Sequence, residues 1–182
     1  MKTIYTFLAL FLLVGLNAQD RYLTRSGDVK FFSNAPLEDI EANTNKALSI
    51  VDISKGQIAV DILVKSFEFE KQLMQEHFNE NYMESDKYPK AQFSGTFEAA
   101  ESLKQMREGV YEVEVSGDLT IHGVSKPIKT MATLKVNMGK LSGEVVFKAN
   151  VKEFDIKIPK VVVKNIAEEV EITGAFNYEP YK

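Results

Sequence analysis

The chain has 182 residues, no cysteine and no tryptophan, and a formal net charge of −4 at pH 7. This length corresponds to one domain, and the negative charge argues against nucleic acid and anionic membrane surfaces as partners. Because there is no cysteine, disulfides are excluded and the fold has to be stabilised by its hydrophobic core.

Residues 1–18 have the pattern of a secretory signal peptide. Lys2 precedes an apolar run from Ile4 to Leu16, and Asn17-Ala18-Gln19 places a small residue at the expected cleavage point. The run is too short to span a bilayer; a buried first helix is the alternative.

We therefore expect cleavage after Ala18 and a mature domain over residues 19–182, with a formal charge of −5 once Lys2 is removed. We place the protein in the periplasm or outside the cell. We expect no stable membrane anchor, because the sequence has no second long apolar run and no lipoprotein cysteine.

The first part of this domain indicates three strands. Val29 and Phe31 share a face of the strand predicted over Asp28 to Ser33, and a polar, acidic loop is expected from Pro36 to Asn45. Ala47 to Ile53 is apolar on both faces and is expected to be covered on both. After a turn at Lys55-Gly56, alternation over Ile58 to Val64 predicts a half-buried strand.

The middle of the chain interrupts this β pattern. Glu70 to Phe78 has the composition of a short helix, and a polar loop over Glu84 to Lys87 follows it. Tyr88-Pro89 ends the loop, because the residue before proline is pushed to an extended conformation. Gln92 to Phe97 then alternates as a strand. In an antiparallel barrel we expect such an insertion to lie across an open end.

The second half is a series of alternating segments joined by short glycine turns. We predict strands over Tyr111–Ile121, Ile128–Met138, Leu141–Ala149 and Val170–Tyr178. The total is about eight strands with almost no helix, which closes into an antiparallel barrel or folds into a sandwich.

Four strands carry a glycine on the apolar, inward face: Gly95, Gly117, Gly143 and Gly174. Glycine inside a strand marks a bend or a place where another group approaches closely. These glycines therefore either relieve curvature or leave room for a ligand, since an eight-stranded barrel is wide enough to be filled by side chains or to hold one small ligand.

No catalytic constellation is evident. His77 and His122 are the two histidines, and neither has a second histidine or a cysteine at ligand spacing, so we predict no metal site and no cofactor. A Gly-x-Ser-x-Gly elbow is also missing. We interpret His77 as a packed or mouth-lining residue and expect the protein not to be an enzyme.

The segment from Val151 to Glu169 mixes apolar residues with Lys157, Lys160 and Lys164, and Pro159 interrupts it. One interpretation is an edge strand protected by charge and proline. The other is a lid at a barrel mouth, where valines contact a lipid and a lysine contacts its polar head.

The sequence resembles the YceI-like family of exported bacterial proteins over Tyr22 to Tyr178. The resemblance rests on motifs in a shared order: His77 opening a loop that closes on Tyr88-Pro89, the segment Val115–Pro127 with Gly117-Asp118-Leu119-Thr120, and Phe154–Ile158 followed by Val170–Ile172. It implies an all-β fold with one short helix, an antiparallel eight-stranded lipocalin-like β-barrel with a helix and loop across one end. It also implies a polyisoprenoid ligand, and it favours a cavity over a filled barrel.

The leading hypothesis is a carrier or sequestering protein that holds a long isoprenoid lipid, a polyprenyl phosphate or an isoprenoid quinone, without a covalent bond. The alternatives are a filled barrel that binds another envelope protein and an enzyme acting on a small amide or lipid with His77 as base. The oligomeric state stays open, a homodimer included. The candidate ligand-binding residues are Phe67, Phe69, His77, Phe78, Tyr82, Phe93, Phe97, Leu119, Leu134, Phe147, Lys157 and Phe176.

Overall fold

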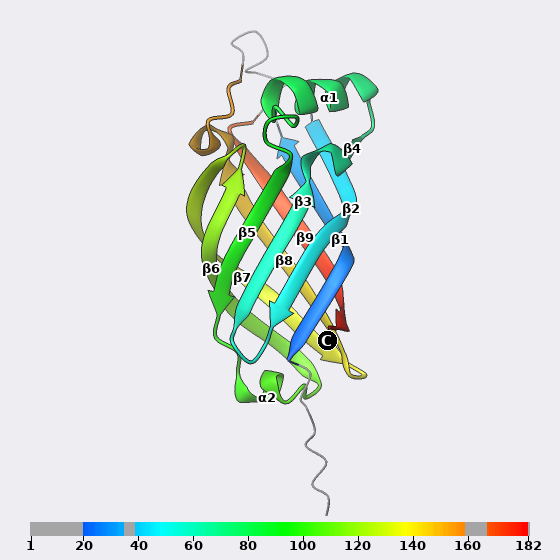
Figure 1. Ribbon diagram of the computed structural model, residues 1–182, viewed down its shortest axis with the longest axis vertical. Coiled ribbons are helices and arrows are strands. Elements are labelled where there is room, and N and C mark those ends of the chain that lie inside the picture. Colours follow the sequence, from blue (N-terminus) through cyan, green and yellow to red (C-terminus); the bar gives the residue numbers. More distant parts are fainter. Residues whose placement is uncertain (1–19, 35–38, 159–166, 182) are drawn as a thin grey trace, which may run out of the picture.

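Eight long strands close into an antiparallel β-barrel in the computed structural model, which describes residues 20–34, 39–158 and 167–181 (Figure 1). In chain order these strands are β1 (Arg21–Asn34), β2 (Asp39–Asp52), β3 (Gln57–Leu63), β5 (Lys90–Phe97), β6 (Gly109–Ile121), β7 (Val124–Asn137), β8 (Lys140–Asn150) and β9 (Glu169–Pro180). The hydrogen-bonded order is β1-β9-β8-β7-β6-β5-β3-β2, and β2 pairs with β1 to complete the ring. The short strand β4 (Glu68–Phe69) pairs with β2.

The two ends of the barrel carry the short helices. Helix α1 (Gln72–His77) and the π-helical turn η2 (Phe78–Tyr82) lie across one end, and α2 (Glu101–Lys104) lies at the other (Figure 1). Two 3-10 turns, η1 (Val64–Ser66) and η3 (Val151–Phe154), complete the regular elements of the described residues. We call the end with α1 the capped end and the end with α2 the packed end.

Tight turns explain how consecutive strands become neighbours. Two-residue loops, His122-Gly123 and Met138-Gly139, join β6 to β7 and β7 to β8, and all four residues have positive φ angles. Left-handed conformations at both loop positions give a turn whose twist matches that of the flanking strands. These hairpins confirm the predicted succession of antiparallel strands.

The polar loop predicted over Pro36 to Asn45 is wrong for Asp39–Asn45, which belong to β2; residues 35–38 lie outside the described part of the chain. The inward side chains here are Ile40, Ala42 and Thr44, of which only Ile40 is strongly apolar, so hydrophobic alternation is too weak to reveal the strand. Ala42 lies opposite Phe31 on β1, and Thr44 lies opposite Val29. The large residues of β1 fill the space that the small residues of β2 leave.

Two other expectations need correction. Ala47 to Ile53 is not covered on both faces, because Leu48 is 39% exposed on the outside of β2. Val151–Ile158 is not an edge strand: it forms η3 and then an irregular segment, while residues 159–166 lie outside the described part. The helix predicted over Glu70–Phe78 is confirmed, although it begins at Gln72 and continues into η2.

The inward glycines serve two purposes. Gly95 on β5 and Gly117 on β6 are partners, and a Cβ on Gly117 would lie 2.2 Å from the carbonyl oxygen of Ser94. This pair therefore permits a close approach of two strands and supports the interpretation that glycine relieves curvature. A Cβ on Gly174 would instead lie 2.8 Å from the ring of Phe176, so this glycine makes room for a side chain of the protein itself.

The packed half of the barrel is a conventional hydrophobic core. Leu103 of α2 is fully buried there, and the Tyr178 hydroxyl lies 2.9 Å from the fully buried Ser49 hydroxyl. Burial raises the pKa of Tyr178 to about 12, with the Ser49 hydrogen bond acting in the opposite direction. A neutral, hydrogen-bonded tyrosine thus ties β9 to β2 across the interior.

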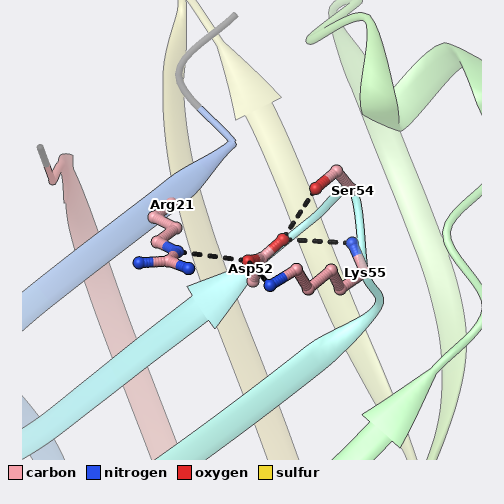
Figure 2. Close-up of polar contacts among 4 residues, drawn as sticks. All are labelled: Arg21, Asp52, Ser54 and Lys55. Carbon is pink, nitrogen blue, oxygen red and sulfur yellow. Dashed lines mark hydrogen bonds and ion pairs between the residues drawn. The ribbon is translucent and has the colours of Figure 1, made fainter.

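A polar network fixes the packed end where β1 meets β2 (Figure 2). The carboxylate of Asp52 accepts hydrogen bonds from the Arg21 guanidinium at 3.2 Å, the Ser54 hydroxyl at 2.8 Å and the Lys55 backbone amide at 3.0 Å. Burial alone would raise the pKa of Asp52, but these hydrogen bonds outweigh burial and hold the pKa below its ordinary value of 3.8. The network joins the β2–β3 turn to the first strand.

Tyr178→Phe should remove part of the alkaline sensitivity of the fold. The raised pKa means that the folded state keeps a proton which the unfolded chain releases above pH 10, so wild-type stability falls as pH rises from about 10 towards 12. We expect this loss to reach roughly 2–3 kcal/mol in the wild type and to be smaller in the variant. Urea unfolding from about pH 8 upward measures this loss of stability. Identical pH profiles of stability in wild type and variant would show that Tyr178 does not cause the alkaline sensitivity.

Asp52→Asn should destabilise the protein at neutral pH and less so in acid. Because the folded-state pKa is lowered, the carboxylate contributes stability above its unfolded pKa and loses it as pH falls through the folded one. The difference in unfolding free energy between wild type and variant should therefore shrink towards about pH 2. Chemical denaturation across this range checks the prediction, and a pH-independent difference would rule it out.

An apolar cavity beneath a helical cap as candidate functional site

The capped half of the barrel encloses a cavity of about 360 Å³, at the small end of the range of roughly 300–1,000 Å³ typical of ligand pockets. All eight barrel strands contribute to its wall, together with α1, η2, η3 and β4. No lysine, arginine, aspartate or glutamate is among the described residues that line it. The interior is therefore suited to an apolar chain.

The position of a residue along its strand decides whether its inward side chain lines the cavity or belongs to the core. On β9, Tyr178 is in the core, whereas Ile172 and Val170 line the cavity. On β7, Leu134 is in the core and Ile128 lines the cavity. The boundary between the cavity and the packed core therefore crosses the barrel near its middle.

The cap presents one apolar face to the cavity. Its lining residues are Met74, His77, Phe78, Tyr82 and Met83. The Met83 amide donates to the Phe78 carbonyl at 2.8 Å, the i→i+5 bond of a π-helical turn. This wider turn keeps Phe78, Tyr82 and Met83 on the same side, and a regular α-helix would rotate Met83 away.

Four phenylalanine rings pack together under the cap. The Phe78 ring lies 5.4 Å from Phe31, 5.9 Å from Phe67 and 5.0 Å from Phe69, measured between ring centroids. Pairs at such distances add about 0.5–1.5 kcal/mol each to the free energy of area burial. The cluster attaches the cap to β1 and β4 and forms one wall of the cavity.

A second attachment, which we call the His122 latch, consists of Glu84, Tyr88, His122 and Phe154. His122 Nε2 lies 2.8 Å from the Glu84 carboxylate, and Nδ1 lies 3.1 Å from the Phe154 carbonyl oxygen. The Tyr88 ring contacts the imidazole edge-on at 4.5 Å. The Glu84 carboxylate and the Phe154 carbonyl oxygen, which face the two ring nitrogens, are both hydrogen-bond acceptors.

Backbone strain gathers at this latch. Glu84, His122 and Asp155, the residue after Phe154, have φ angles of 42°, 52° and 55°. Non-glycine residues adopt this left-handed region at a cost, and the hairpin turn requires this conformation at His122. The latch therefore joins the loop after the cap, the β6–β7 turn and η3 in one defined arrangement.

Few polar groups reach the cavity. His77 and Tyr82 do so from the cap, and Ser33, Gln92 and Thr130 do so from strands. Burial raises the pKa of Tyr82 above its ordinary value of 10.0, so its hydroxyl is a neutral polar group in the cavity wall. The described residues contain no group of three or more histidine, cysteine, aspartate and glutamate side chains able to hold a metal ion.

Most of the predicted ligand-binding residues lie where the prediction places them. The structure brings nine of the twelve to the cavity wall: Phe67, Phe69, His77, Phe78, Tyr82, Phe93, Leu119, Phe147 and Phe176. Their contact with a ligand stays a prediction.

The other three lie elsewhere. Phe97 and Leu134 point inward but belong to the core of the packed half. Lys157 is exposed, although its neighbours Ile156 and Ile158 line the cavity. The segment around Lys157 thus turns an apolar edge to the interior and places the lysine at the rim.

Several lining residues were missed: Phe31, Met74, Met83, Phe154, Ile156 and Ile158. Alternation on β1 already placed Phe31 with Val29 on one face. Phe154, Ile156 and Ile158 alternate with Asp155 and Lys157 in the sequence, so a signal was present, although these residues lie at the end of η3 and in the irregular segment after it.

Comparison with known proteins agrees with this architecture. The model of the YceI-like domain matches residues 26–178. A polyisoprenoid binding domain from Saccharophagus degradans implicated in plant cell wall breakdown has a TM-score of 0.75 at 13% identity, covering 89% of this chain and 99% of that one.

Burkholderia cenocepacia BcnA follows with a TM-score of 0.65 at 18% identity, covering 84% and 96% of the two chains. The Campylobacter jejuni YCEI protein has a TM-score of 0.60 at 18% identity, covering 82% and 89%. At these identities the structural similarity shows a common fold. Among curated proteins, none matches this sequence. Within the described residues, no helix has the length and apolar character needed to cross a bilayer.

His122→Phe should release the loop after the cap. The variant keeps an aromatic ring beside Tyr88 but loses the hydrogen bonds to Glu84 and Phe154, which should cost about 1–3 kcal/mol of unfolding free energy. Amide hydrogen exchange over residues 78–88 should accelerate more than exchange in β6. Glu84→Gln, which keeps an acceptor, should show a smaller effect. Unchanged exchange over 78–88 in His122→Phe would show that the latch does not hold the loop.

Proposed function

The chain belongs to the YceI-like domain family, and from this premise we propose that it carries or sequesters a long isoprenoid lipid inside its barrel. The ligand class is a polyprenyl phosphate or an isoprenoid quinone, held without a covalent bond and without chemical conversion. The protein acts in the periplasm or outside the cell, after removal of residues 1–18.

The proposal rests on one observation: the cavity has no charged residue among the described residues that line it. Transfer of apolar surface from water is worth about 25 cal/mol per Å², so a long hydrocarbon chain gains enough from burial to need few polar contacts. A charged substrate would leave its charge without a partner among the described lining residues, at a large desolvation cost. The structural neighbour from Saccharophagus degradans is described as a polyisoprenoid binding domain, which supports the same ligand class here.

The polar end of the lipid belongs at the capped end. His77 is exposed on the cap and also reaches the cavity, and Lys157 is exposed beside two lining isoleucines. A lysine binds phosphate as a point charge, so Lys157 favours a phosphorylated head group at the rim. Lys160 and Lys164, which belong to the same hypothesis, lie outside the described residues.

The direct test is native mass spectrometry of the mature protein, purified from a bacterial host without detergent, followed by organic extraction. An adduct whose mass contains isoprene increments would support the proposal and identify the lipid. A mass without any adduct, unchanged after incubation with octaprenyl phosphate and with ubiquinone, would favour the alternative of an interaction module.

Phe147→Asp should abolish lipid binding, whereas Val146→Asp should not. Both residues are on β8; Phe147 lines the cavity and Val146 is 55% exposed on the outer face. An unpaired carboxylate inside the cavity is poorly solvated and weakens the binding of an apolar chain. The same lack of solvation also disfavours ionisation of the carboxyl group. Lipid content after purification and the dissociation constant for added prenols measure the effect. Undiminished binding by folded Phe147→Asp would place the ligand elsewhere.

A further inference from the structure

We propose that Phe176 is the floor of the cavity and sets the length of apolar chain that the protein accepts. This inference rests on the proposed function and deepens it, because it assigns a chain-length limit to one residue. It concerns where a chain stops inside the barrel, and not which head group the chain carries.

Phe176 lies on the boundary between the two halves of the interior. It lines the cavity and is also part of the hydrophobic core, with 7% of its surface exposed. One inward position further towards the packed end, Tyr178 belongs to the core alone. On the neighbouring strand β8 the same change occurs between Val145, which lines the cavity, and Gly143, which does not, and on β7 it occurs between Ala132 and Leu134.

Glycines on two strands make room for the Phe176 ring. A Cβ on Gly27 of β1 would lie 2.5 Å from the ring, and a Cβ on Gly174 of β9 would lie 2.8 Å from it. Gly143 is the direct partner of Phe176 on β8, but a Cβ there would lie 3.2 Å from Leu134 and 3.4 Å from Tyr178 and would not meet the Phe176 ring. Any larger residue at 27 or 174 would collide with the ring, so these glycines allow the ring to lie against the barrel wall.

The core beneath the ring gives a chain no space to continue. The Phe176 and Tyr178 rings stack with centroids 6.1 Å apart, and the Tyr178 hydroxyl is hydrogen-bonded to buried Ser49. A chain that passed the ring would have to displace this buried pair and leave hydroxyl groups unsatisfied. The end of the chain therefore stops at Phe176.

A floor makes a specific prediction about chain length. Each additional buried methylene raises affinity about fourfold. Affinity should rise in this way until the chain end reaches Phe176 and should then stop rising, because further carbons stay outside the mouth. Moving the floor should move this plateau without changing the slope below it.

The experiment measures dissociation constants for a homologous series of straight-chain 1-alkanols from decanol to docosanol, and for farnesol, geranylgeraniol and solanesol. Displacement of a fluorescent fatty-alcohol probe provides the signal. We expect the plateau of Phe176→Ala to lie at longer chains than that of the wild type, with Phe176→Leu between them. Ala132→Leu, which raises the floor, should move the plateau to shorter chains.

Phe32→Ala is the matched control, since it removes the same ring from the alternate, outer-facing position on β1 and should leave the plateau unchanged. If Phe176→Ala does not fold, the Ala132→Leu variant provides the test. A plateau at shorter chains in this variant supports Phe176 as the floor, and a plateau at the wild-type chain length overturns it.

The outcomes separate this inference from the proposed function. Wild-type protein that binds prenols, with a plateau that no inward variant moves, overturns the floor and leaves the proposed function standing. Wild-type protein that binds neither alkanols nor prenols overturns both.

Discussion

Closure of the antiparallel sheet is the constraint on which the rest of the structure depends. Once β1 pairs with both β9 and β2, every second residue of each strand points into one enclosed space. At the packed end that space is filled by tyrosine, leucine and valine side chains and by Leu103 of α2. At the other end the inward residues leave a cavity, so the same alternation produces a core in one half and a site in the other.

The cap turns this open space into a defined site. Phe78 and its three aromatic neighbours attach the cap on one side, and the His122 latch attaches the following loop on the other. The two attachments differ in chemistry: the first is apolar and insensitive to charge, while the second depends on a histidine facing a carboxylate.

The sequence predicts which side chains point into the barrel, but it does not predict how far along the barrel axis each of them lies. Alternation alone places Phe93, Phe147, Phe97 and Leu134 on inward faces, and all four do point inward. Only the first two line the cavity, because strand stagger and the position of α2 decide which inward residues meet the core. The first part of β2 was missed because, of its inward residues Ile40, Ala42 and Thr44, only Ile40 is strongly apolar, although Ala42 and Thr44 are buried in the folded barrel.

The sequence by itself determined the succession of most strands, the hairpins, the interruption that becomes the cap and the resemblance to the family, since these follow from local alternation, turn residues and motifs in order. Only the tertiary structure decided where the cavity ends, which aromatic rings close it, and that His122 joins Glu84 to Phe154. The physical reason is that these features depend on contacts between residues far apart in the chain. The Phe176 ring beside Gly27 is one such contact, and no periodic pattern of apolar residues records which side chain fills the space left by a glycine on another strand.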